Sequence, residues 1–301
     1  MYRKTNMKQI SFLLLFSFLW IQSSAGQELP DYSPEDASIV ANIDSIRSVE
    51  LKLSNFSNVR YIPLETTDDC LIGNINKALI RNNRIYVADF DQAFALFVFD
   101  LQGKFLFKIA RMGQGPGEYV SFRDFDIQSN GDIYMFDHFG RKFLLFDSEG
   151  EYLRDMGTDY TLSSFCLVKN KMYWSKLLVP GKRLAELAVY DMTAKRTDFL
   201  LKNSKWLSHN VHINYASYVF YNSPSGATYY SPRFSNIIYS IGENGVKPAI
   251  GIKNLRMPPE DIIKKWEEDS KNAKFTIVDD KLYFKENIHI YETDMKVVGG
   301  L

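Results

Sequence analysis

Short runs of hydrophobic residues, bounded by glycine and aspartate turns, follow one another along the middle of the chain. Between Arg84 and Met156 one pattern occurs twice: a run with a central tyrosine, a second aromatic run that ends in aspartate, a glycine turn, and a third run. The runs span residues 84–89, 96–100 and 104–108 in the first copy, and 132–137, 143–147 and 151–154 in the second. Aromatic and β-branched runs separated by such turns are typical of consecutive antiparallel strands. A self-similar unit of this size predicts a repeat fold.

The central tyrosine of the first run recurs along the chain. Equivalent positions are Tyr86, Tyr134, Tyr173, Tyr229 and Tyr283, and their intervals bracket the ~40–50 residues expected of a four-stranded propeller blade. The first four follow candidate inner strands at Asn74–Ile80, Phe122–Gln128, Leu162–Val168 and His212–Phe220. We therefore predict an all-β fold, a β-propeller of four-stranded antiparallel blades with five blades visible. The sequence leaves three alternatives open: a five-bladed ring, an incomplete sixth blade closed by the strand-like run Val59–Leu64, or a shortened product.

The N-terminus has the features of an export signal. Three basic residues precede the apolar run Ile10–Ile21, which is followed by the small residues Ser23–Ala25. The run is too short to span a bilayer, so we predict a signal peptide over residues 1–25, cleaved near Ala25. The mature protein is then mildly acidic, periplasmic or secreted, and without a transmembrane segment.

Two further segments differ from the repeats. The polar segment 26–52 contains prolines and many acids and predicts a loosely packed arm, so that the propeller domain occupies residues 53–301. Residues 258–272 form an insertion in which prolines, early acids and apolar residues on one face predict a short amphipathic helix. This helix either packs on the rim of the propeller or docks a partner.

Three short motifs suggest a family. Residues Ile62–Thr66 read Ile-Pro-Leu-Glu-Thr, residues Gly113–Tyr119 read Gly-Gln-Gly-Pro-Gly-Glu-Tyr, and Tyr230–Pro232 read Tyr-Ser-Pro. In these motifs the chain resembles the six-bladed β-propeller proteins exported in number by Bacteroidetes, relatives of the NHL-repeat propellers. The resemblance covers most of Val59–Lys285 and implies a fold and an export route, but no reaction. The C-terminus is short for six blades.

The motif loop Gly113–Tyr119 lies where functional residues are expected. In a four-stranded blade, the loop that leads to the next blade and the loop between the two middle strands open on the same face. The glycines of the motif loop allow two interpretations. They turn backbone amides toward an anion, or they simply let the chain cross tightly between blades, with Arg111 and Glu118 forming an ion pair. The ligand-binding residues that we expect on this face are Arg111, Gln114, Glu118, Tyr119, His138, Arg141, Arg183 and Arg233.

The aromatic residues of the same loops allow two interpretations. Phe90, Phe94, Phe139 and Phe234 fall in these loops. They either form a platform for a sugar or a peptide, ringed by the arginines, or cap the ends of the blades.

The inner strands offer a candidate cation site. Asp124 and Asp126 lie two residues apart and so share one side of their strand. With Asn214 they would suit a hard cation such as Ca²⁺ at the channel mouth. The simpler interpretation is a polar lining of a wet channel, with no cofactor. Cys70 and Cys166 either pair in an oxidising compartment or are buried thiols in different repeats.

Catalysis and nucleic-acid binding find little support. The chain has four histidines, no Gly-x-Ser-x-Gly elbow and a formal net charge of zero. We therefore expect a monomeric, non-enzymatic binding or scaffold protein that engages a protein or carbohydrate through its loop face. The alternative is a metal-dependent propeller hydrolase of the gluconolactonase kind.

Overall fold

The computed structural model describes residues 29–45, 59–179, 182–202, 219–223, 226–232, 235–253, 275–278 and 281–284. By its internal contacts the chain divides at Pro30 into residues 1–30 and residues 31–301. The described part is nearly all β, with two short 3-10 helices, η1 (Pro34–Asp36) and η2 (Ile43–Ser45). The predicted signal peptide and the predicted helix at 258–272 lie outside the described residues.

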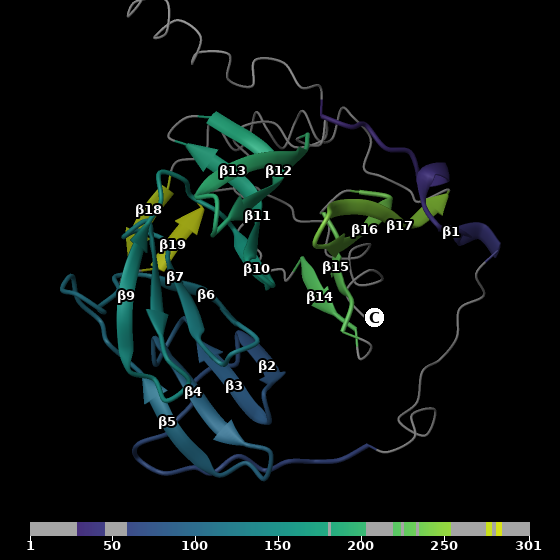
Figure 1. Cartoon of the computed structure of the whole chain (residues 1–301). Helices are drawn as coiled ribbons and strands as arrows, with labels where there is room; N and C mark the ends of the chain where they lie inside the picture. Colours follow the sequence, from purple (N-terminus) through teal and green to yellow (C-terminus); the bar gives the residue numbers. More distant parts are fainter. Residues whose placement is uncertain are drawn as a thin grey trace, which may run out of the picture. The chain divides into compact units, whose positions relative to one another are not determined.

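Four sheets of four antiparallel strands are arranged as a propeller, as predicted (Figure 1). Blade 1 is β2 (Lys77–Arg81), β3 (Arg84–Asp89), β4 (Ala95–Asp100) and β5 (Phe105–Ile109). Blade 2 is β6 (Phe122–Ile127), β7 (Ile133–Asp137), β8 (Lys142–Phe146) and β9 (Tyr152–Gly157). Blade 3 is β10 (Ser164–Val168), β11 (Lys171–Val179), β12 (Lys182–Asp191) and β13 (Arg196–Leu201). Blade 4 is β14 (Phe220–Asn222), β15 (Thr228–Tyr230), β16 (Ile237–Gly242) and β17 (Gly245–Lys253), and a fifth sheet has two described strands, β18 (Phe275–Val278) and β19 (Lys281–Phe284).

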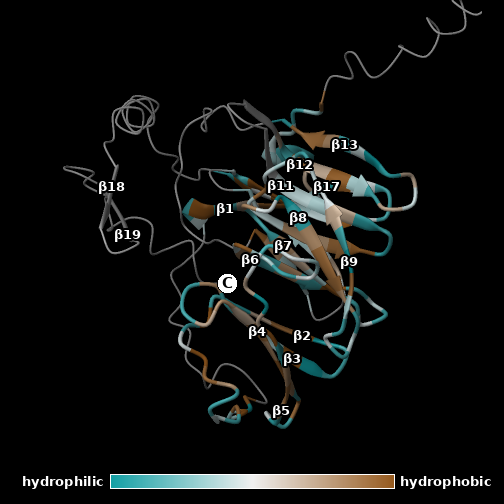
Figure 2. Cartoon of the chain, turned by 90° about the vertical axis from the view of Figure 1, so that its left-hand side faces the viewer, coloured by the Kyte–Doolittle hydropathy of each residue, from teal (hydrophilic) through white to brown (hydrophobic). Residues whose placement is uncertain are grey.

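The predicted tyrosine repeat is confirmed in the first three blades. Tyr86, Tyr134 and Tyr173 lie at the same place in the second strand of their blades and are buried. Each one packs in the hydrophobic cluster between its own blade and the next. Hydrophobic residues run along the strands and hydrophilic ones gather in the turns (Figure 2).

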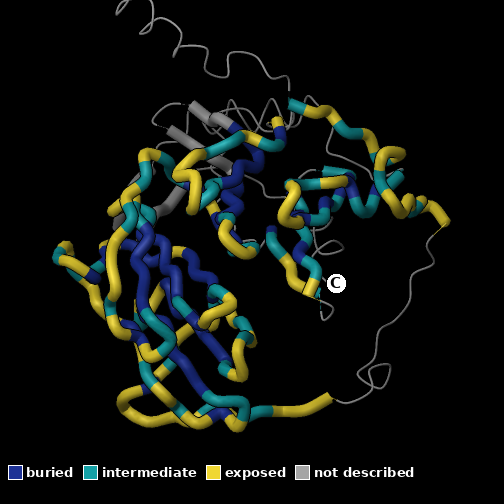
Figure 3. Tube along the Cα trace, viewed as in Figure 1, coloured by how far each residue is buried: buried dark blue, intermediate teal, exposed yellow. Residues whose placement is uncertain are grey.

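Bulky rings fill the space between blades, because two packed sheets lie about 10 Å apart. Trp174 of blade 3 stacks on Phe143 of blade 2 at 5.9 Å and on Tyr190 of its own blade at 5.3 Å. The middle strands of blades 1 and 2 are buried, whereas the outer strand β9 is mostly exposed (Figure 3). The blades therefore hold one another mainly through apolar contact.

The run Val59–Leu64, which the sequence suggests as a strand, is not one in the structure. It has no strand pairing, and Ile62 and Leu64 instead pack against the apolar face of blade 1 that points away from blade 2. The backbone N–H of Glu65 donates to the carbonyl of Gly103 at 2.8 Å. Pro63 has no N–H to give to a ladder, so the segment covers blade 1 with side chains.

The N-terminal arm contributes a strand that the sequence does not suggest. β1 (Ile39–Asn42) pairs in parallel with β17, the outermost strand of blade 4. Tyr32 packs against Tyr239 with ring centroids 5.9 Å apart. Glu35 pairs with Lys253 at 3.1 Å. Part of the predicted loose arm is therefore docked on blade 4.

Candidate functional site

Two buried aspartates organise the loops at one end of blades 1 and 2. Asp89 ends β3, and its carboxylate accepts N–H groups of Gly73 and Asn74, at 2.9 and 2.8 Å, from the segment that leads into β2. It also accepts N–H groups of Asp91 and Gln92, at 3.1 and 2.8 Å, from the β3–β4 loop. One carboxylate thus fixes two loops at once.

Asp137 repeats this arrangement at the end of β7. Its carboxylate accepts N–H groups of Val120 and Ser121 at 3.0 and 2.9 Å, and that of Gly140 at 3.1 Å. Both carboxylates are buried, so their side of each bond is shielded from water. The blade 1 and blade 2 loops of this face are therefore held by the same device.

The glycine loop Gly113–Tyr119 closes mainly on itself. The carboxylate of Glu118 turns inward and accepts the N–H of Gly115 at 2.8 Å. Arg111 lies 3.8 Å from Glu151, so the ion pair found for it is not the pair with Glu118 that the sequence suggests. At Gly117 the φ angle is +74°, and a Cβ there would lie 2.8 Å from the Tyr152 ring. The glycines thus serve the tight crossing between blades, while Gln114 stays exposed.

Tyr119 joins the glycine loop to blade 1. It is fully buried, and its hydroxyl donates to the carbonyl of Phe94 at 2.5 Å and accepts the N–H of Arg111 at 3.2 Å. Burial raises the pKa of Tyr119 to about 12, so the hydroxyl keeps its proton near neutral pH. Tyr119 is therefore a clamp beneath the surface, whereas the sequence placed it among the ligand-binding residues.

Four exposed apolar side chains lie in the segment Tyr119–Ser121 or in the loops bonded to it. Their exposed fractions are 70% for Phe139, 51% for Met112, 41% for Val120 and 38% for Phe94. Met112 forms a backbone bridge with Tyr119, and the residue before Phe139 donates its N–H to the Ser121 carbonyl at 2.9 Å. The backbone segments that carry these apolar residues therefore lie close together.

Three exposed arginines come from the same segments: Arg111, Arg123 and Arg141. The guanidinium group of Arg111 lies over the Phe146 ring at 5.6 Å, and Arg123 donates to the Ser121 hydroxyl at 3.3 Å. We call the four apolar side chains and these three arginines the Tyr119 face. The sequence predicted that these loops share one face, and the contacts of Tyr119 and Ser121 bring them together. Phe94 and Phe139 are exposed as a platform requires, whereas Phe90 is buried in the core.

A polar network borders the Tyr119 face. Asp91 accepts the side-chain amides of Asn74 and Asn76 at 3.0 and 2.6 Å. Its other carboxylate oxygen lies 3.8 Å from Arg123. The sequence pattern missed Arg123, Met112 and Val120, because nothing in a single strand marks which side chain stays uncovered between blades.

His138 lies half-buried beside the Tyr119 face. Its ring makes edge contacts with Phe136 and Phe139, with centroids 6.1 and 5.3 Å apart. Burial lowers the pKa of His138, and the charge of Arg123 lowers it further. The imidazole is therefore neutral at physiological pH and supports Phe139 as an aromatic neighbour rather than as a cation.

The structure describes less of the other residues that the sequence predicts on this face. Arg183 lies on β12, and Arg233 and Phe234 lie outside the described residues. Asn214, one of the three candidate cation ligands, lies outside them too.

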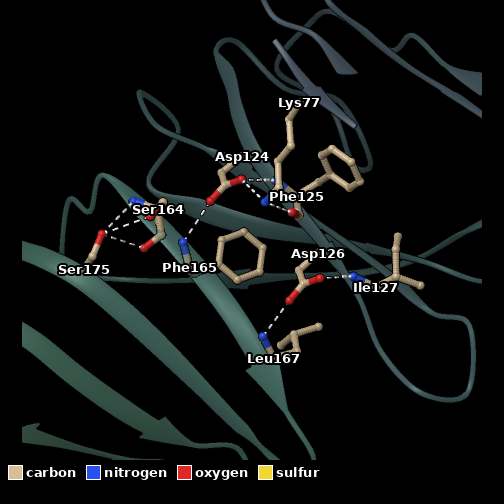
Figure 4. A network of polar contacts seen from close by, with 9 residues as sticks. All are labelled: Lys77, Asp124, Phe125, Asp126, Ile127, Ser164, Phe165, Leu167 and Ser175. Atoms are coloured by element: carbon tan, nitrogen blue, oxygen red, sulfur yellow. Dashed lines mark hydrogen bonds and ion pairs between the residues drawn. The ribbon is translucent and has the colours of Figure 1, made fainter. Parts of the chain in front are cut away.

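Asp124 and Asp126 lie on the same side of β6 and reach the next blade (Figure 4). Asp124 accepts the Phe165 N–H at 2.8 Å, and Asp126 accepts the Leu167 N–H at 2.7 Å. Lys77 of blade 1 donates to Asp124 at 2.7 Å. The two carboxylates are therefore engaged in joining the inner strands of neighbouring blades.

The described part of the chain holds neither a cluster of metal ligands nor a disulfide. No group of three histidine, cysteine, aspartate or glutamate side chains is placed there to hold a metal ion. Cys70 and Cys166 are free, buried thiols in different apolar clusters, and burial raises the pKa of the Cys166 thiol. This agrees with the second interpretation of the cysteines.

A comparison with models of protein families shows which family the chain belongs to. A model described as a domain of unknown function, DUF4934, matches residues 38–299. The chain belongs to the DUF4934 family. No curated protein matches the sequence.

A solved structure shares the fold of this DUF4934 chain. A Bacteroides fragilis protein described as exported matches with a TM-score of 0.62 and 18% identity over 75% of the chain. The chain spans 64% of the length of that protein. A DUF4221-family member from Bacteroides vulgatus matches with a TM-score of 0.43 and 11% identity, over 65% of the chain and 62% of its own length. Within the described part of the DUF4934 chain, no helix is long and apolar enough to cross a bilayer.

Proposed function

We propose that the protein is an exported, non-enzymatic binding or scaffold protein that holds a protein or carbohydrate ligand on the Tyr119 face. The observation that supports this most is the exposure of Phe94, Met112, Val120 and Phe139 on neighbouring segments that also carry three arginines. Aromatic residues, methionine and arginine are enriched in binding surfaces, and contiguous apolar exposure is uncommon elsewhere.

Rigidity of the backbone supports the same proposal. Asp89, Asp137 and Tyr119 fix the loops before any ligand arrives. Binding then costs little loop ordering, which leaves more of the contact free energy for affinity. The glycine loop contributes by positioning Arg111 and Met112, and Gln114 and Arg141 extend the face.

Export rests on the N-terminal sequence. We propose that residues 1–25 are a signal peptide cleaved near Ala25 and that the mature protein is periplasmic or secreted and monomeric. The structural neighbour from Bacteroides fragilis is described as an exported protein, which agrees with this localisation. The six-bladed, NHL-like character suggested by the motifs belongs to the same proposal.

Pull-down from extracts of the source cells, quantified by mass spectrometry, tests the proposed face. The bait is the mature protein, compared with the double variant Phe139→Ala/Arg123→Ala. The matched control is Phe199→Ala/Arg196→Ala, which removes an exposed ring and an exposed arginine from the outer strand β13. Ligands that bind the face are lost with the first variant and kept with the control; equal recovery by all three baits contradicts the proposal.

The hydrolase alternative receives less support from the geometry. Its acids, Asp124 and Asp126, already accept backbone N–H groups within and between blades. A Ca²⁺ site there would have to displace those bonds, whose loss leaves buried donors unsatisfied. We expect no saturable rise of the melting temperature on titration with CaCl₂, and a rise that disappears in Asp126→Asn would favour the hydrolase.

A further inference from the structure

A small polar cavity lies between blades 3 and 4. Its volume is about 290 Å³, and the turns β10–β11, β12–β13 and β16–β17 surround it. Among the described residues that line it, only Val168 is apolar. Successive turns of a four-stranded blade alternate between its two ends, and the Tyr119 face is built from the β3–β4, β5–β6 and β7–β8 loops. The cavity therefore opens at the other end of the blades and is separate from the Tyr119 face.

A lysine at this junction stands where blade 1 has an arginine. Arg84 and Lys171 each begin the second strand of their blade. Arg84 crosses to blade 2, where it donates to the Ser148 carbonyl and pairs with Glu149 at 2.8 Å. Lys171 makes one hydrogen bond with the described residues of blade 4, to the Glu243 carbonyl at 2.6 Å. One contact in place of two leaves space between blades 3 and 4.

Hydrogen bonds hold the three turns in place around the cavity. The N–H of Met192 donates to the Asn170 carbonyl at 3.0 Å, which joins the two turns of blade 3. The hydroxyl of Tyr173 donates to the Gly242 carbonyl at 2.7 Å, which joins blade 3 to the β16–β17 turn. Burial raises the pKa of Tyr173 to about 12, so this donor keeps its proton. The walls are therefore formed before a ligand arrives, and binding costs little ordering.

The charges of the lining residues balance. Two are positive and two are negative: Lys169, Lys171, Asp191 and Glu243. Lys169 and Glu243 form an ion pair with each other. Arg196, which lies outside the lining, pairs with Asp198 at 2.9 Å. A charged ligand would meet charges of both signs, so the cavity favours a neutral one.

Unused hydrogen-bonding groups favour a ligand that carries hydroxyl groups. Asp191 accepts two backbone N–H groups of its turn through one carboxylate oxygen, at 2.9 and 2.8 Å, and the other oxygen accepts none from the described residues. The side-chain amides of Asn170 and Asn244 also have no hydrogen-bond partner within the described part of the chain. An ammonium group has three N–H donors, and Lys171 uses one of them. Because a hydroxyl group both donates and accepts, neighbouring hydroxyls satisfy all of these groups at once.

We propose that this cavity binds a neutral saccharide through the hydroxyl groups of one sugar ring. The hydroxyls donate to Asp191 and accept from Lys171 and from the Asn170 amide. Ligand cavities measure roughly 300–1,000 Å³, so the volume of about 290 Å³ suits a single ring. This is a second site, and it does not depend on what the Tyr119 face binds.

A glycan array and saturation-transfer difference NMR with glucose, galactose, mannose and N-acetylglucosamine test the site in the mature protein. Asp191→Asn keeps a carbonyl oxygen for the turn and removes the charge, and Lys171→Met keeps a long side chain and removes the donors. The matched control is Asp147→Asn, because Asp147 accepts two N–H groups of the β8–β9 turn of blade 2 in the same way. Equal melting temperatures for these proteins establish that the fold is kept.

At least one neutral sugar should bind saturably, with a dissociation constant that rises about tenfold or more in Asp191→Asn and in Lys171→Met. Binding should stay unchanged in Asp147→Asn and in Phe139→Ala, which alters the Tyr119 face. If no sugar shows a signal that depends on Asp191 and Lys171, the inference is overturned.

Glycine and inorganic phosphate serve as zwitterionic and anionic probes of the same cavity. If either binds there in place of the neutral sugars, and Asp191→Asn or Lys171→Met abolishes that binding, the saccharide assignment is wrong. The proposed function of the Tyr119 face is decided separately, since its test changes Phe139 and Arg123 and leaves this cavity intact.

Discussion

At the scale of single residues, buried carboxylates explain why two irregular loops are well fixed. Asp89 and Asp137 stand at the end of the second strand in their blades, where a carboxylate reaches the N–H groups of two separate loops. Charge-assisted bonds of this kind are stronger than neutral ones. The sequence shows both aspartates as repeated strand ends, but only the structure shows that they hold the loops.

Asp89→Ala should lower the free energy of unfolding by about 3 kcal/mol at pH 7, because several buried N–H groups lose their acceptor. Burial alone would raise the pKa of Asp89, but the N–H donors of Gln92, Asn74, Asp91 and Ala93 outweigh it and hold that pKa below its usual range. A lowered pKa stabilises the fold above the unfolded value of about 3.9 and loses this effect as pH falls through the folded value. Urea titrations at pH 7 and below pH 4 measure the difference in free energy of unfolding between wild type and Asp89→Ala.

The difference in free energy of unfolding between wild type and Asp89→Ala should therefore become smaller only in acid. Asp100→Ala is the control, since Asp100 is half-exposed and caps a turn through Gln102 and Lys104. We expect it to cost about 1 kcal/mol or less. A difference for Asp89→Ala that is equally small, or independent of pH, contradicts the role of this carboxylate.

Tyr119→Phe should cost about 1–3 kcal/mol of stability, because the Arg111 N–H and the Phe94 carbonyl lose a buried partner. The ring itself remains, so the blade 1–blade 2 core keeps its volume. Thermal unfolding gives the loss, and hydrogen exchange at Arg111 locates it. Tyr221→Phe, which alters an exposed tyrosine, should change neither.

At the scale of the elements, the sequence predicts what is local and misses what is not. Five of the six runs predicted between Arg84 and Met156 begin and end within one residue of the observed strands, and the sixth, 151–154, starts one residue before β9 and ends three residues early. Most of these strands are continuous apolar and aromatic runs between clear turns, so their pattern is sufficient. β1 pairs in parallel with β17, some two hundred residues away, and a four-residue run cannot specify such a distant partner.

Gly251→Ala should release the docked arm. A Cβ on Gly251 would lie 2.0 Å from the Pro34 carbonyl oxygen, so the side chain and the arm cannot occupy the same place. Hydrogen exchange at Ile39–Asn42 should speed up to nearly that of an open chain, with a loss of about 1–2 kcal/mol in stability. The rest of blade 4 should keep its protection.

Gly242→Ala is the matched control for the arm. A Cβ on Gly242 meets nothing within 4 Å, and this glycine also lies on blade 4, at the end of β16. Exchange at Ile39–Asn42 should then be the same as in the wild type. Protection that persists in Gly251→Ala would show that the arm does not depend on close contact with β17.

At the scale of the whole molecule, the sequence predicts that loops from different blades meet, because propeller geometry alone requires it. It does not predict which side chains remain uncovered, since that depends on how neighbouring blades pack. The inner strands illustrate the same limit. Asp124 and Asp126 share a side of β6 as their spacing predicts, but their partners are backbone amides of β10, which no sequence pattern announces.

Asp126→Asn should make stability less dependent on pH above the ordinary carboxyl pKa of about 3.9. Burial raises the pKa of Asp126, although the charge of Lys77 and two backbone N–H groups act in the opposite direction. A group whose folded pKa exceeds its unfolded value stabilises the fold while protonated, and this stabilisation is lost as pH rises through the folded value. Wild type should therefore lose stability over this range relative to Asp126→Asn, as measured by urea unfolding at several pH values. Asp132→Asn, on a half-exposed turn of the same blade, is the control, and its free energy of unfolding should change with pH as that of wild type does. Parallel curves for Asp126→Asn as well would mean that the carboxylate joining blades 2 and 3 is ionised throughout, and that the junction between these inner strands tolerates a full negative charge.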